Sequence, residues 1–332
     1  MNLMRIAVVG ATGMLGRHVA DAIAASAHEL ILIHRGGPSS ERLHGLKAQQ
    51  RIADLDQPES WPDALQDVEA VIQCAGFYPR DIRPWQEDVL QATQQMQSFY
   101  KACAQVPTLR KVVYLGAAIA LPMAGAGQLA HADLRYSGPP ANKNPYIQVK
   151  WALDELALEQ AHKGLPLSIA IPSMTFGEYD YGPSTGQLLL GVARGDLPGY
   201  VAGQRNVIAA SDAGRGILAV AERGRSGQRY LLTGHNTDMD EVVALASAWA
   251  KRSPPKKVPL ALARLLGAWQ SLRYRRGGPF PKITPTALAV MSAGQHLDGS
   301  KAREELGFSA QLDLASTVNR ALDWFSAEGY LD

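Results

Sequence analysis

The feature that most constrains this chain is a run of three evenly spaced glycines near its N-terminus. The stretch Gly10-Ala11-Thr12-Gly13-Met14-Leu15-Gly16 follows an apolar run that predicts a strand and opens a segment with helical periodicity. Glycine permits a tight turn at position 10, approach of a phosphate at 13 and close packing of helix on strand at 16. N–H groups at a helix start attract anions. We therefore predict that a dinucleotide pyrophosphate binds to Gly10, Thr12, Gly13, Met14, Leu15 and Gly16.

Beyond this loop, short apolar runs alternate with longer periodic segments, which is typical of a parallel sheet with crossover helices. We predict strands at 6–9, 30–33, 51–53, 68–73, 112–115 and 167–171, and helices at 14–25, 61–65, 85–104 and 145–162. The fold class is therefore α/β, a Rossmann doubly wound parallel sheet. The length of 332 residues exceeds one usual core. We assign residues 1–172 to the NAD(P)-binding domain, with a return segment near 205–233, and residues 173–204 and 234–332 to a smaller C-terminal α/β substrate lobe.

The residues after the second predicted strand indicate which dinucleotide is bound. An NAD site usually has an acidic residue there that hydrogen-bonds the ribose. This chain instead has His34-Arg35-Gly36, and Arg35 could pair with a 2′-phosphate. We expect NADP(H) rather than NAD(H); the alternative is a solvated surface arginine. The adenine and ribose would be lined by residues after the third and fourth strands, namely Asp54, Leu55, Ala75 and Gly76.

Tyr146 and Lys150 lie four residues apart at the start of a predicted helix, so their side chains share one face. A phenol exchanges protons poorly at neutral pH, and a neighbouring cation lowers its pKa by stabilising the phenolate. We predict that Tyr146 is a general acid or base and that Lys150 assists it and hydrogen-bonds the nicotinamide ribose. The alternative is that the two residues only solvate an exposed helix.

Together these residues resemble the extended short-chain dehydrogenase/reductase family, which is NAD-dependent epimerase/dehydratase-like. The nearest resemblance is to dihydroflavonol-reductase-like and hopanoid-associated sugar epimerase-like members, and residues 110–115, 183–186 and 298–308 share it. The resemblance implies that Pro172, Ser173 and Met174 contact the nicotinamide end of the cofactor. It also implies a helix-mediated homodimer.

The chain departs from that family just after the fifth predicted strand. The family usually has Ser or Thr there, whereas this chain has Gly116 and Ala117. In the family this hydroxyl polarises the substrate carbonyl, and losing such a donor weakens transition-state stabilisation. A substitute donor from the flap or the lobe takes its place, the activity is weak, or the protein only binds nucleotide.

Our first hypothesis is an enzyme, an NADP(H)-dependent reductase or dehydrogenase that acts on a small carbonyl or alcohol substrate. A sugar-nucleotide epimerase or dehydratase that retains NAD(H) is the related alternative. A nucleotide-binding or redox-sensing protein with little or no activity is the alternative from another class.

Composition argues against several classes of partner for this chain. A net charge of +2 gives no case for nucleic acid, and two cysteines, Cys74 and Cys103, favour neither a disulfide framework nor a metal site. No apolar run is long enough to span a membrane, so we expect a soluble cytoplasmic protein without stable membrane insertion. We expect residues 121–144 to form an active-site flap. We expect the amphipathic segment 261–272 to pack on the lobe's core, with contact to a membrane surface as the alternative.

Overall fold

The computed structural model describes residues 3–79, 83–279 and 284–331. Its large sheet has seven parallel strands in the order β3-β2-β1-β4-β5-β6-β9. These are β1 (Arg5–Val9), β2 (Glu29–His34), β3 (Gln49–Ile52), β4 (Ala70–Gln73), β5 (Lys111–Leu115), β6 (Leu167–Pro172) and β9 (Arg229–Leu232). The predicted doubly wound sheet is confirmed. Its order reverses between β1 and β4, and a crevice forms at the carboxyl ends of strands at such a point.

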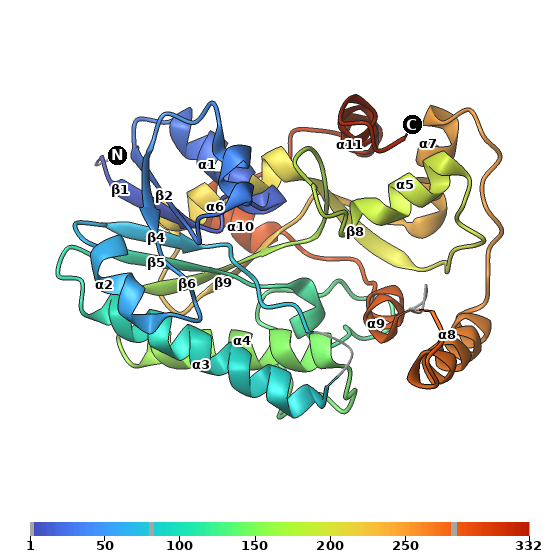
Figure 1. Cartoon of the computed structure of the whole chain (residues 1–332), viewed down its shortest axis with the longest axis horizontal. Coiled ribbons are helices and arrows are strands. Elements are labelled where there is room, and N and C mark those ends of the chain that lie inside the picture. The colour runs from blue at the N-terminus through green and yellow to red at the C-terminus, as the bar shows by residue number, and fades with distance from the viewer. Residues whose placement is uncertain (1–2, 80–82, 280–283, 332) are drawn as a thin grey trace.

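Helices cover both faces of this sheet (Figure 1). One face carries α1 (Met14–Ala24), α6 (Ala210–Arg223) and α10 (Ser300–Leu306), and the other carries α2 (Trp61–Ala64), α3 (Trp85–Ala104) and α4 (Pro145–His162). Short 3₁₀ turns lie at Pro38–Leu43, Pro58–Ser60 and Ala118–Ala120. The central strands are largely apolar because both of their faces are buried, and polar residues such as Arg5, Gln73 and Lys111 stand at their ends.

The start of α4 is set locally by sequence. Asn144 caps it, because its Oδ1 accepts hydrogen bonds from the backbone N–H groups of Tyr146 at 3.0 Å and Ile147 at 3.5 Å. Pro145 occupies the first helical position, where its missing N–H costs nothing. This cap fixes the turn that carries Tyr146.

A small sheet and further helices form the lobe on the right of Figure 1. The sheet has the order β10-β8-β7. Its strands are β7 (Met174–Phe176), β8 (Gln204–Ala209) and β10 (His235–Asp238). A separate apolar core joins them to α5 (Gly186–Arg194), α7 (Met239–Trp249) and α11 (Leu314–Ala327). The remaining helices, α8 (Leu260–Arg275) and α9 (Pro285–Ser292), pack against each other at the edge of the lobe.

Two expectations about segments need correction. The sequence predicts that 205–233 returns to the Rossmann sheet, but 205–209 belong to β8 of the small sheet, and only α6 and β9 join the large one. The expected flap at 121–144 does not line the main cleft. It is tied instead to the C-terminal segment, where Ala130 pairs with Leu297 and Lys301 Nζ lies 2.9 Å from Asp133 Oδ1.

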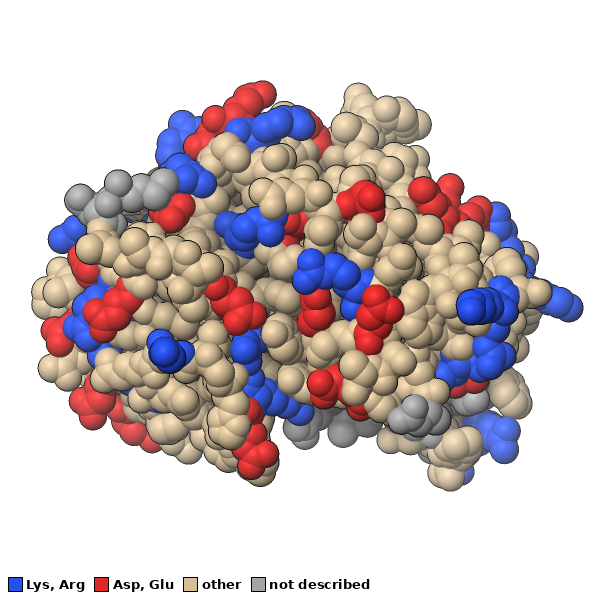
Figure 2. All heavy atoms as spheres, turned by 90° about the horizontal axis from the view of Figure 1, so that it is seen from above, with Lys and Arg blue, Asp and Glu red and all other residues tan. Residues whose placement is uncertain are grey.

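Charge is distributed unevenly over the surface. In Figure 2 acidic and basic side chains are mixed over much of the visible face, whereas Lys and Arg gather toward its right-hand end. That end carries α7 and α8 in Figure 1.

Candidate active site

A cleft of about 1470 Å³ opens at the carboxyl ends of the central strands and continues toward the small lobe. It brings together all the residues that the sequence analysis singled out for cofactor binding or catalysis: Gly10, Thr12, Gly13, Met14, Leu15, Gly16, Arg35, Asp54, Leu55, Ala75, Gly76, Tyr146, Lys150, Pro172, Ser173 and Met174. Their individual roles remain predictions.

The glycine loop is shaped to admit a phosphate. Gly10 has φ +84°, and a Cβ there would lie 2.8 Å from the backbone nitrogen of Ala75. A Cβ on Gly16 would overlap the carbonyl oxygen of Gly10, so α1 can approach β1 this closely only with glycine. Gly13 caps α1 without a side-chain hydrogen bond, and the first turn holds no acidic residue. The N–H groups of that turn are therefore open to an anion.

At the adenosine end of the cleft, Arg35 follows β2 and is exposed. Within the described ranges it makes no hydrogen bond or ion pair. Arg42 is held differently, because its guanidinium carbon lies 4.5 Å from the ring centroid of Tyr181. Among the described residues the donors of Arg35 are thus free, at the place where the sequence analysis expects a ribose phosphate.

The other end of the dinucleotide site is marked by a buried hydroxyl. Ser173, between β6 and β7, is 6% exposed, and its Oγ has no hydrogen-bond partner among the described residues. A buried hydroxyl usually has a hydrogen-bond partner. The unpaired Ser173 hydroxyl could therefore bond to a ligand in the cleft. This hydroxyl and the glycine cradle both fit a nicotinamide dinucleotide.

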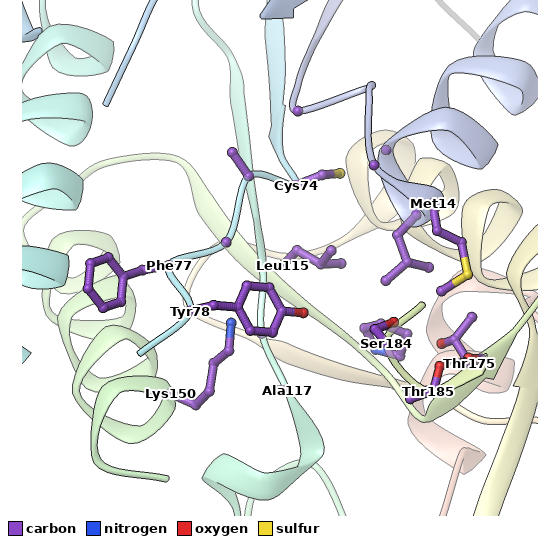
Figure 3. Close-up of a pocket in the computed structure, with 18 of the residues that line it drawn as sticks. Met14, Cys74, Phe77, Tyr78, Leu115, Ala117, Lys150, Thr175, Ser184 and Thr185 are labelled. Atoms are coloured by element: carbon purple, nitrogen blue, oxygen red, sulfur yellow. Dashed lines mark hydrogen bonds between the residues drawn. The ribbon is translucent and has the colours of Figure 1, made fainter. Parts of the chain in front are cut away.

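Tyr146 and Lys150 meet a third side chain that the sequence analysis missed. The ring of Tyr78 is stacked on that of Tyr146, with centroids 6.0 Å apart and an interplanar angle of 13°. Lys150 Nζ lies 5.3 Å from the Tyr78 centroid and 5.6 Å from that of Tyr146. Figure 3 shows Tyr78 reaching across the cleft beside Lys150. No described residue hydrogen-bonds the Lys150 ammonium, which leaves it available to a ligand.

Burial dominates the titration of this cluster. It raises the pKa of Tyr146 well above the usual value, with a smaller contribution from Tyr78. It lowers the pKa of Lys150 to about 8. The net shift of the Tyr146 pKa in this structure is therefore upward, not downward as the sequence analysis expected, because desolvation of the phenolate is its largest cause. The Tyr146 hydroxyl is protonated at neutral pH and is suited to donate a proton.

The two residues after β5 differ in the space around them. A Cβ on Gly116 would lie 2.9 Å from Ile169 Cγ2 and 3.1 Å from Ile171 Cγ1, so no serine fits there without a shift. Both residues line the cleft, but Ala117 already carries a Cβ there (Figure 3). The missing hydroxyl therefore corresponds to Ala117.

The substrate end of the cleft holds cations that the sequence analysis also missed. Arg205 on β8 is 5% exposed, and it donates to the carbonyl oxygens of Gln204 and Met291 at 2.6 and 3.1 Å. No carboxylate within the described ranges pairs with it, and burial lowers its pKa. Arg83 also lines the cleft and pairs with Asp88 at 2.5 Å. Little in the sequence indicated that Arg205 lines the cleft, because the small sheet that contains it was not predicted.

The described residues form neither a metal site nor a membrane-spanning helix. None of their His, Cys, Asp and Glu side chains form a cluster that could hold a metal ion. None of their helices combines the length and apolar character needed to cross a membrane. Both cysteines are free thiols.

Comparison with known proteins gives this cleft a family context. The model of the NAD dependent epimerase/dehydratase family matches residues 6–232. A nucleoside-diphosphate-sugar epimerase from Pseudomonas aeruginosa has a similar structure over 99% of both chains, with a TM-score of 0.86 and 41% identity. A Synechocystis protein named as a dihydroflavonol 4-reductase is 26% identical over 98% of this chain and 95% of its own. The fold is also that of a Bacillus cereus UDP-glucuronic acid 4-epimerase solved with NAD, at 18% identity, TM-score 0.74 and coverage of 98% and 100%.

Proposed function

The chain belongs to the NAD-dependent epimerase/dehydratase family, and from that premise we propose that it is an NADP(H)-dependent reductase or dehydrogenase of a small carbonyl or alcohol substrate. Membership confirms the resemblance drawn from the glycine loop, and the protein is an enzyme of the oxidoreductase type found in this family. One observation carries the proposal. The phosphate loop at Gly10–Gly16 and the pair of Tyr146 and Lys150 line the same cleft.

The proton is handled by Tyr146 in this proposal. A nicotinamide held near Pro172, Ser173 and Met174 would supply a hydride to the substrate carbon. The Tyr146 hydroxyl gives its proton to the substrate oxygen, and the ammonium of Lys150 stabilises the phenolate left behind. Burial raises the Tyr146 pKa, so its hydroxyl stays protonated at neutral pH and can act as the acid that reduction requires.

Tyr78 supplies the hydroxyl that Ala117 lacks. Its ring is held against Tyr146, and its side chain reaches into the cleft (Figure 3). A second donor near the substrate oxygen would stabilise the charge that develops there. The stack between the two rings limits where the Tyr78 hydroxyl can lie, and this preorganisation is what makes such a donor effective.

The choice of NADP(H) rests on Arg35. The family is named for NAD, and the Bacillus cereus relative was solved with it. This chain nevertheless places an arginine with free donors after β2. Planar guanidinium groups bind phosphate through paired hydrogen bonds, so a 2′-phosphate is the complementary group.

The test is a fluorescence titration of the purified protein with NADPH and NADH, followed by a panel of carbonyl substrates. Wild type should bind NADPH more tightly and oxidise it with at least one substrate. Tyr146→Phe should bind NADPH equally well and turn over about 10²-fold more slowly. Equal turnover in both proteins contradicts the role of Tyr146, and absence of binding contradicts the whole proposal.

A sugar-nucleotide epimerase is the second candidate, and two observations favour it. The Pseudomonas aeruginosa relative with 41% identity is described as such an enzyme. Arg205 adds a buried cation, with no carboxylate partner in the part of the chain that the structure describes, and it could receive a diphosphate at the substrate end of the cleft. An epimerase retains its cofactor through the cycle, so mass analysis of cofactor released from freshly purified protein separates the two candidates.

Location and assembly are part of the same proposal. Two free thiols fit a reducing compartment, and we infer the cytoplasm. We also infer a homodimer, which sedimentation analysis would reveal.

A further inference from the structure

The orientation of α8 is opposite to that of an ordinary surface helix. Its small residues Ala263 and Gly267 are buried. The large apolar side chains point outward, with exposed fractions of 46% for Leu262, 68% for Leu265, 41% for Leu266, 56% for Trp269 and 50% for Leu272. At about 100° per residue these five positions fall within an arc of about 120°. The expectation that this helix packs its apolar face on the lobe is wrong.

This outward stripe has no cover from the lobe. The helix contacts α9, beside which it lies in Figure 1, and its buried positions are the small residues Ala263 and Gly267. A contiguous exposed stripe of leucine and tryptophan costs free energy in water and marks an interaction site. We call these five residues the α8 stripe.

Charge around the stripe is of one sign. Residues 242–297 contain nine Lys or Arg and no Asp or Glu, in a chain whose net charge is +2. The rest of the chain is therefore net negative. Exposed members near the helix include Lys256, Arg264, Arg273 and Arg276. Lys and Arg gather at this end of the molecule in Figure 2.

Apolar and basic groups are also interleaved on the helix itself. The guanidinium carbon of Arg273 lies 5.6 Å from the ring centroid of Trp269. Long basic side chains can reach toward headgroups while their stems stay with apolar neighbours, and tryptophan favours the boundary between lipid and water. This combination is typical of helices that lie in a membrane interface.

We propose that the α8 stripe docks the protein on the surface of a bilayer that contains anionic phospholipid. The apolar side chains would enter the headgroup region, and the flanking Lys and Arg would attract the lipid phosphates. A symmetric interface between two copies of this surface fits less well, because it would place basic residues against basic residues. The helix lies on the membrane and does not cross it.

Docking there would bring the membrane beside the cleft. Val290 of α9, together with Ala293 and Gly294 just after it, lines the cleft, and α8 packs on α9. The substrate end of the cleft therefore neighbours the docking surface.

The test uses the full chain and two kinds of vesicle, phosphatidylcholine alone and phosphatidylcholine mixed with phosphatidylglycerol. Flotation is measured for wild type and for the double variant Leu262→Gln/Leu265→Gln. The matched control is Met123→Gln/Leu129→Gln, because those side chains are 55% and 45% exposed and lie outside the cleft. The NADPH dissociation constant and melting temperature are measured for each protein.

Wild type and control should float with the mixed vesicles, and binding should weaken as salt is raised. The α8 variant should bind them at least about tenfold more weakly, with unchanged NADPH affinity and melting temperature. The proposal is overturned if wild type does not float, if it binds neutral vesicles equally well, or if the α8 variant binds like wild type. It is also overturned if the α8 substitutions convert a dimer to a monomer, because the stripe would then be a protein interface. Neither result depends on whether the enzyme is a reductase.

Discussion

The rings of Tyr78 and Tyr146 are stacked nearly parallel, with centroids 6.0 Å apart, although the residues come from different elements. Tyr78 follows β4 in a loop, whereas Tyr146 lies in the capped first turn of α4. Lys150 Nζ lies within 6 Å of both centroids. The contact therefore joins the loop after β4 to the helix that carries the proposed acid.

This contact gives the first prediction, for Tyr78→Phe. The variant keeps the ring and loses the hydroxyl, so cofactor affinity should be unchanged while kcat falls by about 10²-fold. Steady-state kinetics and NADPH titration measure the two quantities. Tyr78→Leu serves as the companion variant and should also disturb Tyr146. If Tyr78→Phe retains full kcat, the hydroxyl is not the second donor.

A second prediction concerns the two residues after β5. Ala117→Ser should fold normally and raise kcat, because it puts a hydroxyl on a side chain that already faces the cleft. It should also restore part of the activity lost in Tyr78→Phe.

Gly116→Ser is the matched control for that substitution. Its Cβ would meet Ile169 at 2.9 Å, so we expect a destabilisation of about 1–3 kcal/mol and a lower melting temperature. Thermal unfolding of both variants checks this difference. Equal stability of the two variants would mean that Ile169 and Ile171 of β6 can shift to make room for the new side chain. If Ala117→Ser does not raise kcat, the missing serine does not limit turnover.

The third prediction is a pH dependence set by Lys150. Burial lowers its pKa to about 8 from a usual value of 10.5, so its cation is lost as the pH rises through 8. Without the cation the Tyr146 phenolate is less stabilised, and kcat should fall with a midpoint near pH 8. In Lys150→Met the rate should be low throughout and lack this step.

Lys111 provides a matched control for the titration. Burial lowers its pKa to about 8 as well, but it donates to Ser168 Oγ at 2.8 Å and does not line the cleft. Lys111→Met should therefore keep the step in kcat near pH 8, and its loss there would rule out Lys150 as the source.

The stability of the fold should rise with pH over the range in which kcat falls. Unfolded lysine holds its proton up to about pH 10.5, so both lysines make unfolding less favourable as pH rises from 8 toward that value.

Much of the large sheet could be predicted because most of its strands are buried on both faces and read as largely apolar runs, although the edge strand β3 is polar and mostly exposed. The glycine loop and the pair of Tyr146 and Lys150 could be predicted because each is a local pattern in a context of strand and helix. The small sheet could not. Its strand β7 has only three residues, and β10 reads His235-Asn236-Thr237-Asp238, which carries no strand signal.

The site features that could not be predicted depend on contacts between segments far apart in the sequence. The stack of Tyr78 on Tyr146 depends on how a loop folds, and the burial of Arg205 depends on a sheet formed by residues far apart in sequence. The helix at α8 shows another limit. Periodicity identifies that one face is apolar, but it does not say whether that face turns toward the core or toward solvent.

The last prediction tests the choice of cofactor at Arg35. In Arg35→Ala the affinity for NADPH should fall about 10–100-fold, because a charge-assisted pair with the 2′-phosphate is lost. The affinity for NADH should stay the same, since NADH lacks that phosphate. The neighbouring Arg42 also lines the cleft but lies over the Tyr181 ring, so Arg42→Ala should affect both cofactors alike. Fluorescence titration of the three proteins with both cofactors measures the ratio. If Arg35→Ala weakens NADPH and NADH equally, the residue acts only through the general positive potential of the cleft, and the preference for NADP(H) has no basis in this side chain.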